Sequence, residues 1–213
     1  MDSLSLAITA LFIILPIISF SATQFTKKEA IKCGIDSNRI IVAGMSKYFV
    51  DVRSTRMQET KLIGVILDGK DEMDNNETLI NMAKEFAEEM GYHYILRLHP
   101  YFRGDEYNHL INPSNGGVCS KNVGLFDFLK NLEFCLLANS TVLFELETLK
   151  IPYLRYSSGD IKDKFRDYQS PMFHNYDELK NKYLCQEHVS YMDKIETNNA
   201  KRKYETFFSS FSE

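Results

Sequence analysis

Short apolar runs of strand length alternate along this chain with segments of helical period. The apolar runs lie at residues 61–67, 94–98, 134–138 and 151–155, and the helical segments lie at residues 77–90, 125–129 and 142–150. Strands that are apolar on both faces and alternate with helices are typical of βαβ units, in which the strands are parallel. The sequence therefore predicts an α/β fold, with a Rossmann-like, mostly parallel sheet flanked by helices.

The two ends of the chain extend this pattern. Residues 26–33 predict a helix that ends at Gly34, and residues 39–43 predict a strand. The tail from Glu187 to about Phe211 predicts a terminal helix. We therefore expect an apolar N-terminal segment at residues 1–24 and one Rossmann-like domain at residues 25–213.

Residues 4–20 are almost continuously apolar, and three interpretations of this segment stay open. A secretory signal would account for the small residues at positions 19–22, although no Lys or Arg precedes the apolar run. A membrane anchor would need about this length, although Pro16 lies inside the run. A helix and strand left from a domain ahead of residue 25 is the third interpretation, and the segment that follows favours it.

Composition excludes several classes of partner and site. Of the 213 residues, 44% are hydrophobic and 25% are charged, as in ordinary globular proteins, and the net charge is −4. The basic residues are scattered, so we expect no nucleic-acid partner. The four cysteines are too widely spaced for a metal site, and a disulfide framework is not expected in a chain of this size. We therefore expect a cytoplasmic protein without a bound metal.

Polar residues follow three of the predicted strands directly. They are Asp68–Gly69, His99–Pro100 and the run Asn139-Ser140-Thr141. In an open parallel sheet, ligands bind outside the carboxyl ends of the strands, near a switch in strand order. These residues are therefore expected to lie along one edge of the sheet and to form the functional site.

The third cluster opens a helix and suits an anion. Ser140 and Thr141 offer hydroxyls where the helix dipole favours negative charge, although a plain N-cap would explain them without a ligand. Glu145 lies one turn further on, where its carboxylate could accept hydrogen bonds from two ribose hydroxyls. An exposed helix position explains Glu145 as well.

The other two clusters also have a functional and a structural interpretation. His99 could donate a hydrogen bond to a phosphate oxygen, with Pro100 fixing the direction of the chain, or it could be a structural histidine. Asp68 could serve as a general base. A turn in which Gly69 supplies unusual backbone angles would explain the Asp-Gly pair without any ligand.

Several common nucleotide-binding motifs are absent. The chain has no GxGxxG fingerprint and no Walker loop, which argues against a dinucleotide-dependent dehydrogenase and a P-loop NTPase. No DxD-like pair follows a strand, and the acidic stretch 71–74 is explained as the approach to a helix N-terminus.

The order of these segments resembles that of GT-B glycosyltransferases of bacterial capsule, lipooligosaccharide and teichoic-acid synthesis. The resemblance rests on residues 20–51, 64–69, 94–100 and 135–156, and the similar groups are HP-motif sialyltransferase-like and glycerophosphotransferase-like enzymes. It implies that the chain is the C-terminal, nucleotide-sugar-binding half of such an enzyme. The implied donor-binding residues are His99, Pro100, Ser140, Thr141, Glu145 and Gly69. Asp68 is the implied catalytic base, although Leu67 stands where the motif has a first acid.

The resemblance also implies substrates and partners. The donor would be a nucleotide-activated sugar, with a CMP or CDP group favoured, and no cofactor would be tightly bound. The acceptor would be a glycan or glycolipid, which places the protein at the inner face of the cytoplasmic membrane. Complete enzymes of this type have an N-terminal domain ahead of residue 25, so a separate N-terminal domain partner is implied. Two alternatives stay open: a non-catalytic subunit that needs a partner or membrane anchor, and a sugar-nucleotide epimerase-like enzyme.

Overall fold

The computed structural model describes residues 19–21, 24–42, 61–159, 163–166 and 168–194. The chain divides into two compact units, one containing residues 1–50 and 197–213 and the other containing residues 51–196. The predicted boundary between residues 24 and 25 falls inside the first of these units. Within the described residues, no helix has the length and apolarity to cross a bilayer. Most of the apolar segment 4–20 lies outside the described residues.

The described part of the smaller unit contains an α-helix, a 3-10 helix and two short parallel strands. Its elements are β1 (Ser19–Ser21), α2 (Gln24–Lys32), the 3-10 helix η1 (Ser37–Arg39) and β2 (Ile40–Val42), and β1 pairs with β2. Gly34 has φ +90° and follows the end of α2, where the backbone N–H of Ile35 donates to the carbonyl of Ala30. A left-handed glycine is the usual end of a helix. The predicted helix and strand are confirmed here, with the helix beginning two residues earlier than expected.

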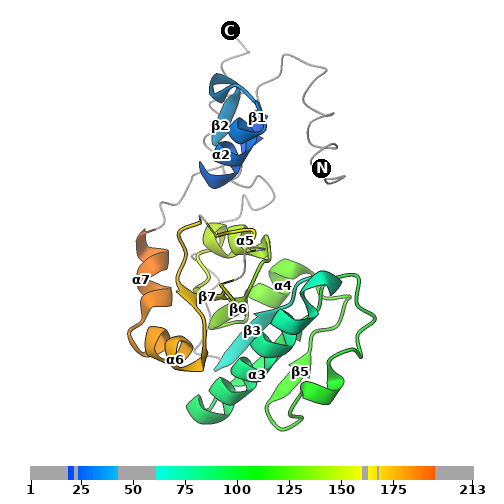
Figure 1. The fold of residues 1–213 in the computed structure, drawn as a ribbon. Coiled ribbons are helices and arrows are strands. Elements are labelled where there is room, and N and C mark those ends of the chain that lie inside the picture. The colour runs from blue at the N-terminus through cyan, green and yellow to red at the C-terminus, as the bar shows by residue number, and fades with distance from the viewer. Residues whose placement is uncertain (1–18, 22–23, 43–60, 160–162, 167, 195–213) are drawn as a thin grey trace. The chain divides into compact units, whose positions relative to one another are not determined.

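The larger unit contains a parallel sheet of six strands in the order β5-β4-β3-β6-β7-β8 (Figure 1). The strands and helices are β3 (Leu62–Ile66), α3 (Met73–Met90), β4 (His93–Arg97), β5 (Gly116–Val118), α4 (Leu125–Leu129), β6 (Phe134–Leu137), α5 (Val142–Thr148), β7 (Tyr153–Tyr156), β8 (Met172–Phe173), α6 (Tyr176–Leu184) and α7 (Glu187–Lys194). Two 3-10 helices, η4 (Lys70–Glu72) and η5 (Asn108–Leu110), lie in the connections. The predicted Rossmann-like fold is confirmed.

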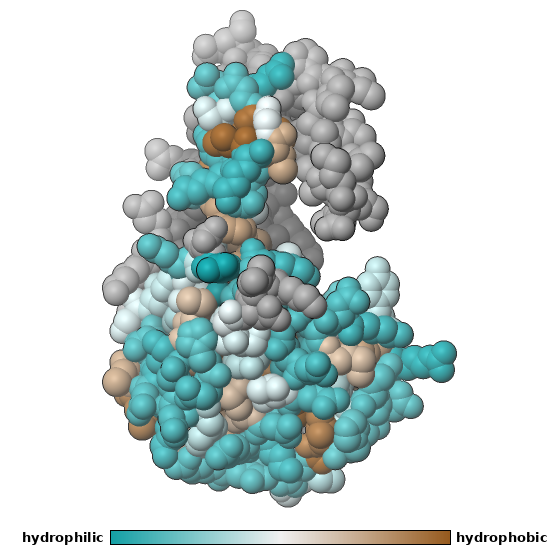
Figure 2. All heavy atoms as spheres, viewed as in Figure 1, coloured by the Kyte–Doolittle hydropathy of each residue, from teal (hydrophilic) through white to brown (hydrophobic). Residues whose placement is uncertain are grey.

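Helices cover both faces of this sheet. On one face, Leu79 and Phe86 of α3 pack with Val65 of β3 and Leu136 of β6, and Leu179 of α6 joins the same core. On the other face, α4 and the residues that follow it lie so close to the sheet that a Cβ on Gly64 would lie 2.4 Å from Leu132 Cδ1 and 3.1 Å from Phe128 Cζ. A larger residue at that position of β3 would force these side chains to shift. The side of the larger unit seen in Figure 2 is mostly hydrophilic, with small scattered apolar patches.

The strand order places a switch point at the centre of the sheet. The chain passes from β3 outward to β4 and β5, and then crosses back through α4 to β6 on the other side of β3. The carboxyl ends of β3 and β6 therefore diverge into helices on opposite faces. In such sheets this divergence opens the ligand-binding crevice.

Two strands and one α-helix of the larger unit were not expected from the sequence. Strand β5 is short and glycine-rich, β8 has two residues, and α6 has only Leu179 fully buried, so none has a strong apolar period. Of the predicted tail helix, residues Glu187–Lys194 are described as α7, and the rest lies outside the described residues.

Candidate functional site

A row of polar residues follows the strands at one level of the sheet. The register of β3 with β4 and with β6 brings the last residues of the three strands level with one another. Ile66 of β3 pairs with Arg97 of β4 and with Leu137 of β6. Two residues further along each strand are Asp68, His99 and Asn139, which are therefore level with one another. The same count gives Ser157 after β7 and His174 after β8. The three predicted strand-end clusters therefore lie along one edge, with Asp68 and Asn139 at the switch point.

The carboxylate of Asp68 is fixed in position. Asp68 is 6% exposed, and its Oδ2 accepts a hydrogen bond from the backbone N–H of Asn139 at 2.8 Å. Asn76 of α3 holds the backbone of Asp68, because Oδ1 accepts from its N–H at 2.9 Å and Nδ2 donates to its carbonyl at 3.0 Å. The same Nδ2 donates to the hydroxyl of Tyr107 at 3.1 Å. This network links the segment after β3, the loop between β4 and β5, and the segment after β6.

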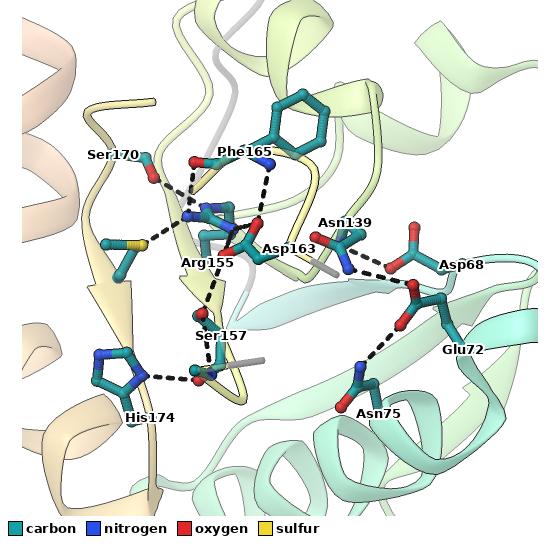
Figure 3. Close-up of polar contacts among 12 residues, drawn as sticks. Asp68, Glu72, Asn75, Asn139, Arg155, Ser157, Asp163, Phe165, Ser170 and His174 are labelled. Carbon is teal, nitrogen blue, oxygen red and sulfur yellow. Dashed lines mark hydrogen bonds and ion pairs between the residues drawn. The ribbon is translucent and has the colours of Figure 1, made fainter. Parts of the chain in front are cut away.

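A second carboxylate lies beside Asp68 (Figure 3). Glu72 accepts hydrogen bonds from Nδ2 of Asn139 at 3.3 Å and from Nδ2 of Asn75 at 2.7 Å. Burial raises the pKa of Asp68 from 3.8 to about 6; the N–H of Asn139 opposes this, and the charge of Glu72 adds to it. A carboxyl group that titrates near neutrality can accept or donate a proton at cellular pH. The sequence does not single out Glu72 as a site residue, because an acidic residue before a helix needs no ligand.

Replacing Asp68 with asparagine is expected to increase the free energy of unfolding at about pH 8 by about 1–2 kcal/mol. The folded-state pKa of about 6 lies above the ordinary value of 3.8, so the carboxylate destabilises the fold as the pH rises through this window. An amide carries no charge and can still accept the N–H of Asn139. Urea denaturation at about pH 8 and about pH 4 measures the gain, which is small at the lower pH.

The exposed acid Asp71 of η4 provides a matched control for this prediction. Asp71→Asn is expected to change the stability little at either pH. Equal effects of the two substitutions at about pH 8 would show that the position of Asp68 carries no desolvation penalty.

His99 and Pro100 stand at the carboxyl end of β4, half-buried and exposed respectively. The backbone N–H of Tyr101 faces Nδ1 of His99 at 3.4 Å. When Nδ1 accepts and the ring is neutral, the hydrogen lies on Nε2, which is then the donor for an anionic oxygen. Arg97 has a structural partner instead, since its guanidinium donates to the carbonyl of Val123 at 2.6 Å.

Ser140 and Thr141 precede α5 as expected. The hydroxyl of Ser140 lies 3.5 Å from the N–H of Val142, a long contact for a cap. Thr141 is exposed and is the N-cap residue, and its hydroxyl makes no cap hydrogen bond within the described part of the chain. Glu145 lies in the first turn of the same helix and is half-buried. Helix capping is therefore a weak explanation for the presence of a hydroxyl at positions 140 and 141.

Gly69 has an ordinary backbone conformation, with φ −66° and ψ −178°. Any residue adopts these angles, so the alternative in which the turn requires glycine is wrong. A Cβ at Gly69 would meet no described atom within 4 Å. The missing side chain leaves open space directly after Asp68.

An ion pair holds the segment after β7 at the same edge (Figure 3). Arg155 is 0% exposed, and its Nη1 lies 2.8 Å from both carboxylate oxygens of Asp163. The hydroxyl of Ser157 also donates to Asp163, at 2.9 Å. The next residue, Lys164, is exposed, and its charge acts to lower the pKa of Asp68. The sequence gives no signal for Lys164, because the segment 158–171 has no periodic pattern.

Comparisons with known proteins test the fold. No family model and no curated protein matches the sequence. Among solved structures, the wall teichoic acid polymerase TagF is 15% identical with a TM-score of 0.57, over 88% of this chain and 56% of that one. The UDP-GlcNAc 2-epimerase of Neisseria meningitidis, bound to UDP-GlcNAc, is 14% identical with a TM-score of 0.60, over 89% of this chain and 61% of that one. The fold is that of GT-B proteins.

A third GT-B structure is similar to the same degree. The UDP-GlcNAc 2-epimerase of Methanocaldococcus jannaschii, in complex with UDP-GlcNAc and UDP, is 17% identical with a TM-score of 0.55, over 89% of this chain and 60% of that one. This chain therefore spans between 56% and 61% of the length of these GT-B neighbours. At such low identities the similarity shows the fold alone. The expected fold, a Rossmann-like sheet like that of GT-B proteins, is confirmed.

Proposed function

We propose that this chain is the donor-binding half of a GT-B glycosyltransferase and binds a nucleotide-activated sugar at the carboxyl edge of its sheet. The observation that carries this proposal is the row of Asp68, His99 and Asn139 at one level, next to the switch point. Two neighbours with this fold have UDP-GlcNAc bound. The proposed pathway is the synthesis of a surface polysaccharide or lipooligosaccharide.

The proposed roles follow from the placement of each residue. His99 donates from Nε2 to a donor phosphate, with Pro100 directing the chain. Ser140 and Thr141 bind a phosphate at the start of α5, and Glu145 accepts from the ribose hydroxyls. The space beside Gly69 admits the nucleotide-activated sugar. The hydrogen-bond donors of His99, Ser140 and Thr141 stabilise the negative charge of the departing phosphate without a bound metal.

Asp68 is proposed as the general base that removes the proton of the acceptor hydroxyl. Its pKa of about 6 gives a largely ionised carboxylate at neutral pH with appreciable proton affinity. We propose a glycan or glycolipid acceptor, a CMP- or CDP-linked donor and a cytoplasmic location at the inner face of the membrane. We also propose a separate N-terminal domain as partner, because active sites of two-domain proteins commonly lie between the domains.

Calorimetric titration of the full chain with CMP, CDP, UDP and GDP tests the donor site. We expect one nucleotide to bind, and His99→Ala to weaken that binding by about 1–3 kcal/mol through loss of a charge-assisted hydrogen bond. His93→Ala is the matched control, because His93 is the exposed first residue of the same strand and lies at its amino end. Equal effects of the two substitutions, or no binding of any nucleotide, would contradict the proposal.

An epimerase-like activity is the second candidate. Two of the neighbours are UDP-GlcNAc 2-epimerases. The pKa of Asp68, about 6, suits a carboxylate that removes a proton from a sugar carbon at neutral pH. Proton NMR of UDP-GlcNAc incubated with the chain separates the candidates. A new epimeric sugar nucleotide in the absence of acceptor would favour the epimerase, and unchanged substrate would contradict it. Nucleotide binding without either reaction would favour the non-catalytic, partner-dependent subunit.

A further inference from the structure

The loop after β4 displays one aromatic side chain to solvent. Tyr101 is 76% exposed, the highest value among the exposed large apolar side chains of the described residues. It follows the His99–Pro100 pair at the carboxyl edge of the sheet. Isolated apolar residues on a surface need no explanation, but this one lies beside the proposed phosphate-binding histidine.

The loop is held firmly on both sides of Tyr101. Phe102 is 1% exposed, packs edge-on against Tyr107 at 5.3 Å between ring centroids, and its N–H donates to the carbonyl of His99 at 3.0 Å. Glu106 accepts the backbone N–H groups of Arg103 and Gly104, and these bonds hold its pKa at about 2. The anchored neighbours therefore fix the backbone from which the Tyr101 side chain projects.

Contacts tie the same loop to both ends of the candidate site. The rings of Tyr101 and His99 lie 4.8 Å apart at an angle of 37°. At the far end of the loop, the hydroxyl of Tyr107 accepts from Asn76, which also brackets the backbone of Asp68. The exposed ring therefore has a defined place beside His99, with its outer face available for a planar group.

We propose that Tyr101 stacks on the nucleobase of the nucleotide whose phosphate His99 binds. This inference rests on the proposed function and adds the residue that holds the base. Every base has a π face, so stacking on tyrosine gives affinity with little discrimination among bases. The base would then be chosen by polar contacts elsewhere, and Tyr101 would support cytidine and uridine nucleotides alike.

Affinity measurements on paired substitutions test this role. With each nucleotide that binds, Tyr101→Ala is expected to weaken binding about ten-fold or more, and Tyr101→Phe, which keeps the ring, much less. If Tyr101→Ala binds as tightly as the unsubstituted chain while His99→Ala binds weakly, the stacking role is wrong and the donor site stands. If no nucleotide binds the unsubstituted chain, the proposed function and the stacking role both fail.

A fluorescence measurement separates stacking from general support of the loop. The chain has no tryptophan, so Tyr101→Trp creates a single reporter, and stacking of a base is expected to quench its emission in a saturable way. Ribose 5-phosphate, which carries the phosphate and ribose but no base, is expected to leave the emission nearly unchanged at the same concentration. Equal quenching by ribose 5-phosphate would contradict base stacking. Leu184→Trp, at an exposed position of α6, is the control whose emission should not respond.

Discussion

Asp163→Ala is expected to lower the free energy of unfolding by about 3–5 kcal/mol, the usual loss when one partner of a buried ion pair is removed. Arg155 is fully buried, so the substitution leaves a guanidinium without its carboxylate inside the protein. Ser157 and the backbone N–H of Phe165 also lose their shared acceptor. Urea denaturation at neutral pH measures the loss.

Acid should remove the same stabilisation in the unsubstituted protein. Burial raises the pKa of Asp163, but the hydrogen bonds from Arg155 and Phe165 outweigh burial and hold the pKa below its ordinary value of 3.8. The stabilisation is therefore complete above the ordinary value and is lost as the pH falls through the folded-state pKa. Asp127→Ala is the control, because Asp127 forms an exposed pair with Lys130 worth about 1 kcal/mol or less. Similar losses in both variants would contradict the buried-pair account.

Glu147→Ala should have the second large effect, a loss of about 3–4 kcal/mol in the free energy of unfolding. Glu147 of α5 is 8% exposed and accepts hydrogen bonds from Tyr153 of β7 at 2.8 Å and from Tyr168. Tyr191 of α7 lies 2.8 Å from the same carboxylate. Burial and the nearby carboxylate both raise the pKa of Tyr153, so the hydroxyls stay protonated and need an acceptor. Without the carboxylate, the buried hydroxyl of Tyr153 and the half-buried hydroxyls of Tyr168 and Tyr191 lose that partner. Thermal and urea denaturation measure the loss.

Glu145 offers a control two residues away on the same helix. Glu145→Gln changes a half-buried carboxylate and is expected to cost less stability than Glu147→Gln while weakening nucleotide binding through the proposed ribose contact. Glu147→Gln is expected to lose stability and retain binding where the protein remains folded. A reversal of these two effects would show that the roles of the two glutamates have been exchanged.

These two glutamates also show what the sequence could and could not predict. Strands with apolar residues on both faces and polar residues directly after them predicted the parallel sheet and the placement of Asp68, His99 and Ser140 along one edge. Local pattern was sufficient there, because parallel strands bring their carboxyl ends together. Glu145 and Glu147 lie in one apolar stretch, and local pattern could not reveal that Glu147 has tyrosine partners distant in sequence.

Long-range pairing explains the other omissions. Arg155 sits within a predicted strand, and its partner Asp163 lies in a segment without periodicity, so neither residue alone indicated an ion pair. Glu72 and Asn139 became neighbours only through the crossover that places β6 beside β3. Gly69 illustrates the reverse case. Its sequence context suggested a special turn, but its backbone angles are ordinary and the space beside it is open.

Backbone amide chemical shifts of isotope-labelled protein, followed during addition of CMP, CDP, UDP or GDP, test most directly whether a nucleotide binds at the carboxyl edge. We expect the largest changes after β3, β4 and β6, at Gly69, His99 and Thr141. Small changes are expected at the amino ends of the same strands, including His93. Largest changes at the amino ends of these strands, or at the hollow beside β8 and α6 that Met172 and Asn181 line, would contradict binding of the nucleotide beside Gly69, His99 and Thr141.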